Sequence, residues 1–184
     1  MTYEMDIAGL KRELPLCRVT DELYIGAFVM FGDVELTVHC AAELLKRAPE
    51  YDYLIAPEAK AIPLLYEMAR QSGAEKYFLA RKGAKAYMTG VFEAEVRSIT
   101  TMHIQKLVID TADAEMIKGK KVLIVDDVIS TGESLHAMED LVKRAGGIIA
   151  GKMAVLAEGD AKDRDDIITL APLPLFNADG SVKE

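Results

Sequence analysis

Apolar residues recur along this chain with two periods, and each period predicts a type of secondary structure. Spacings of three and four residues predict amphipathic helices over 34–48, 62–69 and 135–145. Asp33 is suited to cap the first of these helices, and Gly73 follows the second. Short apolar runs predict strands over 52–56, 76–80, 104–109, 121–125 and 148–156. Helices and strands are therefore expected to alternate.

This alternation predicts an α/β fold, a doubly wound and mainly parallel sheet with helices on both faces. A length of 184 residues suits a single domain over residues 1–184. Within it, residues 1–21 form an N-terminal segment and residues 177–184 are expected to be a loose tail.

Three loops are candidates for a binding site. In doubly wound sheets, ligands bind beyond the carboxyl ends of the strands. The loops in these positions are 57–60, 81–85 and 126–134. Residues 86–103 carry no clear period, so we expect them to form a flap or a hairpin.

Composition narrows the range of partners. Hydrophobic residues make up 51% of the chain, yet no apolar run approaches the roughly 20 residues that a membrane-spanning helix needs. A formal net charge of −8 disfavours binding to nucleic acid, which is a polyanion. The first residues show neither a basic leader nor an apolar signal core, so a cytoplasmic location is expected. Cys17 and Cys40, with three histidines, show no zinc-ligand spacing.

Two adjacent acids, Asp126 and Asp127, follow the apolar strand that begins near Val122. Carboxylates repel a bare phosphate, so this pair is better suited to ribose hydroxyls or to a magnesium ion. A purely structural alternative is that Asp126 ends the strand and that Ser130 and Glu133 form a capping box. Capping leaves the second aspartate unexplained, which favours a binding role.

A short turn of hydroxyl and glycine residues connects the acids to the next predicted helix. Backbone N–H groups and the positive end of the dipole at a helix N-terminus favour a phosphate. Hydroxyl side chains add donors, and glycine lets the backbone approach a ligand closely. The candidate phosphate-binding residues are Ser130, Thr131, Gly132, Glu133 and Ser134.

Residues 122–134 resemble the phosphoribosyl pyrophosphate (PRPP) signature of the type I phosphoribosyltransferases. Residues 54–70 are similar to the pyrophosphate loop of the purine members, and 81–85 resembles their Arg-Lys-x-x-Lys segment. The likeness covers roughly residues 22–170. It implies a homodimeric enzyme of purine salvage with a flexible loop over the active site and a small hood. Its reaction is the Mg2+-dependent transfer of ribose 5-phosphate from PRPP to a purine base, with release of pyrophosphate.

The resemblance also implies a role for each candidate residue. Residues 130–134 hold the 5-phosphate. Asp126 and Asp127 are the catalytic acids, which meet the ribose hydroxyls and the metal ion and stabilise positive charge on the sugar. The pyrophosphate-binding residues are Ala59, Lys60, Arg81, Lys82 and Lys85. The bond between Ala59 and Lys60 is expected to be cis. For the basic residues at 81–85, a solvated loop is the alternative.

The identity of the base rests on weaker signals. Phe28 and Met30 could bound an apolar slot with few polar contacts, which favours adenine, but both are equally compatible with a core strand. Residues 96–100 look more like the corresponding loop of xanthine enzymes, and Glu93 and Glu95 are offset from the glutamate of adenine enzymes. Adenine ranks first, xanthine or guanine second and orotate third. A non-catalytic regulator that senses PRPP is a competing class.

Overall fold

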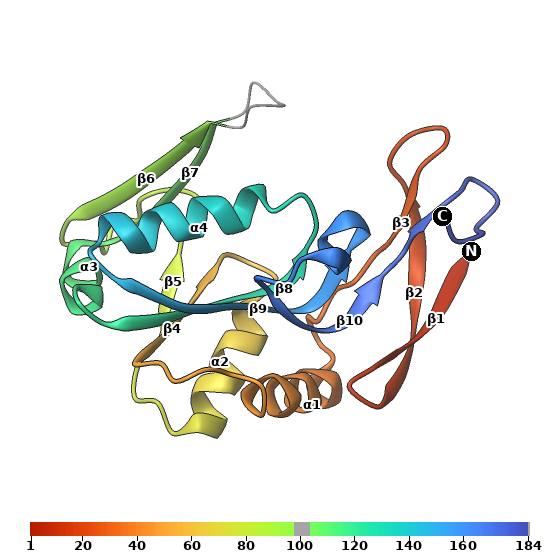
Figure 1. Ribbon diagram of the computed structural model, residues 1–184. Helices are drawn as coiled ribbons and strands as arrows, with labels where there is room; N and C mark the ends of the chain where they lie inside the picture. Colours follow the sequence, from red (N-terminus) through yellow and green to blue (C-terminus); the bar gives the residue numbers. More distant parts are fainter. Residues whose placement is uncertain (98–103, 184) are drawn as a thin grey trace.

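The computed structural model describes residues 1–97 and 104–183 and contains a five-stranded central sheet (Figure 1). The strand order is β10-β9-β8-β4-β5, and each neighbouring pair is parallel. The strands are β4 (Tyr53–Pro57), β5 (Phe78–Ala80), β8 (Lys121–Ile129), β9 (Ile148–Glu158) and β10 (Ile168–Leu173). This sheet confirms the predicted α/β fold.

Helices cover both faces of the sheet, as predicted (Figure 1). One face carries α1 (Val34–Leu45) and α2 (Ile62–Ser72), the other carries α4 (Glu133–Arg144), and the short α3 (Thr111–Ile117) precedes β8. Asp33 caps α1 and Gly73, with a φ of 72°, ends α2, as expected. Across the described ranges, no helix is both long and apolar enough to cross a membrane.

β8 is buried on both of its faces. Leu123 and Val125 pack into the core that includes α1 and α2, whereas Val122 and Ile124 pack into the core that includes α4. A strand covered on both faces can be apolar at every position, which explains its continuous apolar run. The run stops at Asp126, so the sheet carries the acid pair to its carboxyl edge.

Residues 104–109, which the pattern assigned to the parallel sheet, belong instead to a separate hairpin. β7 (Ile104–Asp110) pairs antiparallel with β6 (Val91–Arg97), and both strands pack against α4. An apolar run shows that a strand is buried but does not reveal its pairing partner, which is why the sequence assignment was wrong. Of residues 86–103, which were expected to form a flap or a hairpin, 91–97 form β6, one strand of a hairpin whose other strand, β7, lies beyond that range. Residues 98–103 lie outside the described part of the chain.

A second, four-stranded sheet forms the hood, and its three strand pairings are antiparallel. It contains β1 (Thr2–Ile7), β2 (Leu10–Arg18), β3 (Tyr24–Gly26) and β11 (Leu175–Phe176), in that order. Segments from both ends of the chain therefore meet in the hood (Figure 1). Residues 177–183, expected to be loose, turn back along it: Lys183 N donates to Leu175 O at 2.8 Å, and Val182 bridges to Phe176.

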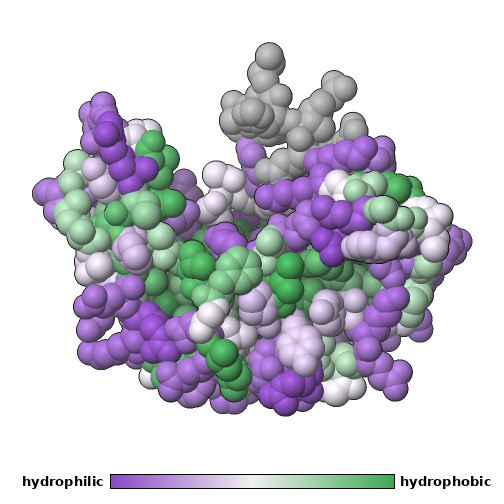
Figure 2. All heavy atoms as spheres, turned by 180° about the vertical axis from the view of Figure 1, so that it is seen from behind, coloured by the Kyte–Doolittle hydropathy of each residue, from purple (hydrophilic) through white to green (hydrophobic). Residues whose placement is uncertain are grey.

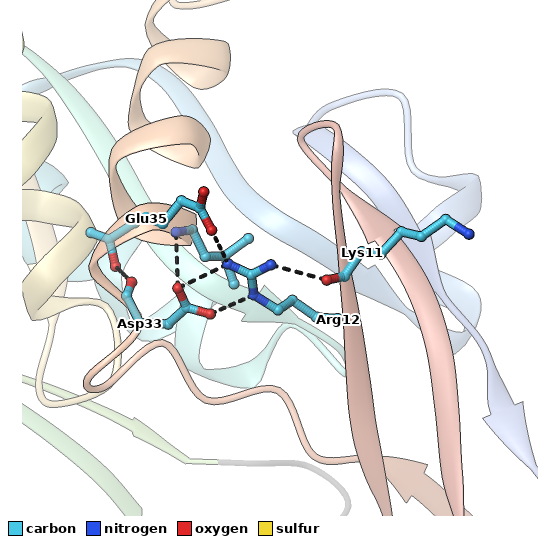
Figure 3. Close-up of polar contacts among 6 residues, drawn as sticks. Lys11, Arg12, Asp33 and Glu35 are labelled. Atoms are coloured by element: carbon cyan, nitrogen blue, oxygen red, sulfur yellow. Dashed lines mark hydrogen bonds and ion pairs between the residues drawn. The ribbon is translucent and has the colours of Figure 1, made fainter.

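Arg12 on β2 links the hood to the start of α1 (Figure 3). Its Nε donates to Asp33 Oδ2 at 2.6 Å, and its Nη2 donates to Glu35 Oε2 at 2.9 Å. Asp33 Oδ1 also accepts from Leu36 N at 3.0 Å, which caps the helix. The hydrogen bond from Arg12 is the main cause that lowers the pKa of Asp33. One carboxylate thus fixes both the helix start and the hood.

Candidate functional site

A cavity of about 460 Å³ opens at the carboxyl ends of β4 and β8. Residues 57–60 form one part of its wall and residues 126–135 form another, so two of the three predicted site loops meet there. From the third loop, 81–85, Lys82 reaches the lining. Seen from behind, the molecular surface is indented between the hood and the rest of the molecule (Figure 2).

Asp126 and Asp127 lie side by side in the wall, with 9% and 4% of their surface exposed. Burial and the adjacent Asp127 carboxylate raise the pKa of Asp126 above its usual range. Lys60 Nζ lies 2.8 Å from Asp127 Oδ2, but this ion pair lacks hydrogen-bond geometry, and the oxygen has no hydrogen-bond partner within the described residues. Buried oxygens of this kind favour a hydroxyl donor or a cation.

The turn before α4 depends on Gly132, which is the N-cap and has a φ of 81°. Glycine adopts this conformation readily, whereas other residues are strained in it. The N-cap is Gly132 and not Ser130, and Glu133 N donates to Thr131 Oγ1 at 3.5 Å, so the capping box considered for Ser130 and Glu133 is not formed. Residues 130–134 all line the cavity, which places the positive end of the α4 dipole against it.

The residues predicted to bind pyrophosphate fall into two groups. Ala59, Lys60 and Lys82 line the cavity. Arg81 and Lys85 do not belong to its lining in the described part of the chain. The structure therefore brings the first group directly to the acid pair and leaves the second group on the adjoining loop.

Glu58 is a site residue that the sequence reasoning did not single out. Its Oε2 lies 3.0 Å from Arg81 Nη1, and its Oε1 accepts from Lys82 N at 2.8 Å. Burial acts to raise the pKa of Glu58, but the hydrogen bond from Lys82 N and the charges of Lys85 and Arg81 outweigh it and lower the pKa. The available signal in the sequence was that Glu58 is the acid of the candidate loop 57–60, which faces the basic residues at 81–85. The cis peptide joins Glu58 to Ala59, one bond earlier than the resemblance implied.

Phe28 and Met30, predicted to contact the base, are core residues. They are 3% and 0% exposed and pack with α1 and α2 rather than lining the cavity. The alternate residues, Val29 and Phe31, are 53% and 51% exposed. The apolar run did not show which of the alternating side chains point inward. A closely packed side chain cannot contact a ligand without repacking, so we leave this pair out of the proposed base site.

Comparison with known proteins assigns a family to this arrangement. Residues 37–172 match the phosphoribosyl transferase domain. The chain belongs to this family. Both main cavity segments, 57–60 and 126–135, fall inside the matched range.

Two sequence relatives and one solved structure show what this chain is similar to. It is 36% identical over 110 residues to an adenine phosphoribosyltransferase of Thermotoga sp. strain RQ2, covering 59% of this chain and 60% of that protein. It is 30% identical over 111 residues to an orotate phosphoribosyltransferase of Caldanaerobacter subterraneus subsp. tengcongensis, covering 60% and 47%. The chain thus spans less than two thirds of the length of either protein. The crystal structure of adenine phosphoribosyltransferase from Thermoanaerobacter pseudethanolicus shares the fold, with a TM-score of 0.66 at 22% identity over 94% of this chain and 95% of that one.

Proposed function

We propose that this chain transfers ribose 5-phosphate from PRPP to adenine, releasing pyrophosphate and forming the nucleoside monophosphate in purine salvage. The observation that carries the proposal is one cavity that combines the buried pair Asp126 and Asp127, the turn at 130–134, and the side chains of Lys60 and Lys82. PRPP has the complementary parts, namely vicinal hydroxyls, a 5-phosphate and a highly charged leaving group. Curated relatives that are adenine phosphoribosyltransferases support adenine as the base.

The sugar and its phosphate are proposed to occupy opposite ends of the segment 126–134. The turn at 130–134 holds the 5-phosphate at the positive end of the α4 dipole. Asp126 and Asp127 accept hydrogen bonds from the ribose hydroxyls. As the bond to pyrophosphate breaks, positive charge develops on the sugar ring, and these carboxylates stabilise it.

The leaving pyrophosphate is proposed to lie along the loop after β4. Ala59 borders this position, and Lys60 and Lys82 neutralise the departing charge. Arg81 and Lys85 are proposed to add charge from the loop that they share with Lys82. Pyrophosphate is thereby separated from the 5-phosphate turn by the acid pair.

The acid pair also suits Mg2+. This ion usually binds to proteins through one or two carboxylates and completes its coordination with water and substrate phosphates. Asp127 Oδ2 is a buried acceptor without a hydrogen bond, and the described residues include no cluster of three or more metal-ligating His, Cys, Asp or Glu side chains. Asp126 and Asp127 would therefore hold the ion together with substrate oxygens, and the ion would supply charge neutralisation.

A panel of bases tests the proposed reaction. The purified chain is mixed with PRPP, Mg2+ and adenine, xanthine, guanine, hypoxanthine or orotate, and pyrophosphate release is measured. We expect turnover with adenine. Turnover with orotate alone would show that orotate and not adenine is the substrate, in agreement with the relative that is an orotate phosphoribosyltransferase. Tight PRPP binding without turnover on any base would favour a PRPP-sensing regulator and overturn the enzymatic proposal.

We further propose that the chain acts as a cytoplasmic homodimer. The large apolar side chains of Val29, Phe31 and Val34 are exposed on one short segment, and such a patch suits an interface between copies. Light scattering should give twice the chain mass of 20.2 kDa. A monomeric mass at working concentration would exclude the dimer, and cell fractionation tests the location.

A further inference from the structure

Arg164 comes from a different part of the chain than the phosphate-binding turn but touches it. It follows η1 (Gly159–Asp163), the 3-10 turn after β9. A β-carbon added at Gly132 would lie 2.7 Å from Arg164 Nη1, which is closer than real β-carbons approach such atoms. The guanidinium therefore abuts the backbone of the turn proposed to hold the 5-phosphate.

Two of the three guanidinium nitrogen atoms of Arg164 donate hydrogen bonds to Asp166. Nε donates to Asp166 Oδ1 at 2.9 Å, and Nη2 donates to Asp166 Oδ2 at 2.8 Å. Nη1, the nitrogen beside Gly132, has no hydrogen-bond partner in the ranges 1–97 and 104–183. A guanidinium oriented by a carboxylate on one side keeps its remaining donors in a fixed direction.

Asp166 is itself held in place by Lys152 of β9, which also contacts α4. Lys152 Nζ donates to Asp166 Oδ2 and also to Glu139 Oε1, the latter at 3.1 Å. The Lys152 side chain is only 13% exposed, and Glu139 lies on α4. These contacts fix Arg164 relative to the helix whose N-terminus meets the cavity. The two positive charges of Arg164 and Lys152 balance the two negative charges of Asp166 and Glu139. Arg164 can therefore act on an anion by donating a short-range hydrogen bond and not by long-range attraction.

From this geometry we infer that Arg164 donates from Nη1 to the 5-phosphate and is an additional ligand of that group. The inference rests on the proposed function and extends it to a residue outside the segment 126–134. Gly132 lines the cavity and Arg164 does not, so the contact requires a phosphate oxygen seated over Gly132. The competing explanation is that Arg164 only supports the turn from outside.

Two probes separate these explanations. Calorimetry on the full chain measures the binding of ribose 5-phosphate and, separately, of Mg2+ pyrophosphate. Arg164→Gln should weaken ribose 5-phosphate binding by roughly tenfold or more, as expected for a lost hydrogen bond to a charged group, and leave pyrophosphate binding unchanged. The matched control is Arg144→Gln at the far end of α4, where Arg144 pairs with Asp140 at 2.7 Å. It removes the same charge and should change neither affinity.

The outcomes are distinct. Unchanged ribose 5-phosphate binding by Arg164→Gln overturns the inference alone, and so does an equal loss for both probes, which indicates a support for the whole cavity. Wild-type protein that binds neither ribose 5-phosphate nor PRPP overturns the proposed function, and the role of Arg164 with it. Arg164→Lys provides a second measurement if the glutamine variant does not fold. Lysine keeps the positive charge but lacks the planar guanidinium with its fixed donor directions, so KM for PRPP should rise while kcat stays unchanged.

Discussion

At the scale of single residues, Asp126 and Asp127 hold two carboxylates side by side where water is largely excluded. Burial of adjacent like charges disfavours the fully ionised pair, and the raised pKa of Asp126 expresses this cost. The cores on either side of β8 do not require the acids, because apolar residues at these positions would be accommodated more easily. Residues that are locally unfavourable in this way are expected at a functional site.

Asp127→Asn tests whether the negative charge itself is needed. Because the amide cannot stabilise positive charge on the sugar, we expect transfer to fall by about 100-fold or more. Removal of a like charge beside Asp126 should leave thermal stability unchanged or increased. The measurements are pyrophosphate release and thermal unfolding. Asp113→Asn, on α3 and paired with Lys76, is the control and should retain wild-type turnover. Near-normal transfer by Asp127→Asn would remove this residue from the site.

At the scale of elements, the turn between β8 and α4 depends on a glycine with positive φ. Gly132→Ala should lower the free energy of unfolding by about 1–2 kcal/mol, because alanine is strained at a φ of 81°. It should also abolish ribose 5-phosphate binding, because the new methyl group meets Arg164. Urea unfolding and calorimetry measure the two effects.

Gly119→Ala is the matched control for the strain. Gly119 has a φ of 72°, and an added β-carbon there meets nothing within 4 Å. A similar loss of stability with normal ligand binding is expected. If both variants bound ribose 5-phosphate normally, the turn would not be the phosphate site.

The contact between the hood and α1 should depend on pH through Asp33. Asn also caps helices well, so Asp33→Asn removes mainly the ion pair with Arg12. The substitution should lower the free energy of unfolding by about 1 kcal/mol at pH 7. The pKa of Asp33 is lowered in the folded state, so this stabilisation is present above the unfolded-state pKa of about 4 and is lost as pH falls through the folded value. Urea unfolding at several pH values should show the two proteins converging below pH 4. If the difference in free energy of unfolding between the two proteins stayed constant with pH, the ion pair would be excluded as the cause of that difference.

Elements whose signals are local were predictable, and those that depend on pairing were not. The strand, turn and helix from Lys121 to Arg144 were recognised because the apolar run, the glycine and the helical face are consecutive. The partner of β7 and the strands of the hood were missed, since pairing depends on segments distant in sequence. The meeting of the loops after β4 and β8 followed from a general rule of parallel sheets, whereas the contacts of Glu58 and Arg164 depend on side-chain directions that no spacing reports.

At the scale of the whole molecule, the hood depends on the two ends of the chain. β11, close to the C-terminal end, pairs with β3, and Phe176 is 0% exposed with its ring centre 4.9 Å from that of Tyr3 on β1. The segment from Asn177 to Lys183 turns back along β11, where Lys183 N donates to Leu175 O. Phe176 is therefore part of the hood core, whereas residues 177–183, which have the composition of a tail, lie on its surface and are held by backbone hydrogen bonds.

Phe176→Ala tests this arrangement. Removal of a fully buried ring should lower the free energy of unfolding by about 3–5 kcal/mol, because the surrounding side chains fill the resulting cavity only in part. Hydrogen exchange should accelerate in β1, β2 and β3, while β8 should keep its protection because its two cores do not include Phe176. Val182→Ala, in the same segment but 47% exposed, is the matched control and should change neither quantity. If both variants matched the wild type, the C-terminal segment would be the loose tail that its composition suggests, and the hood would rest on β1, β2 and β3 alone.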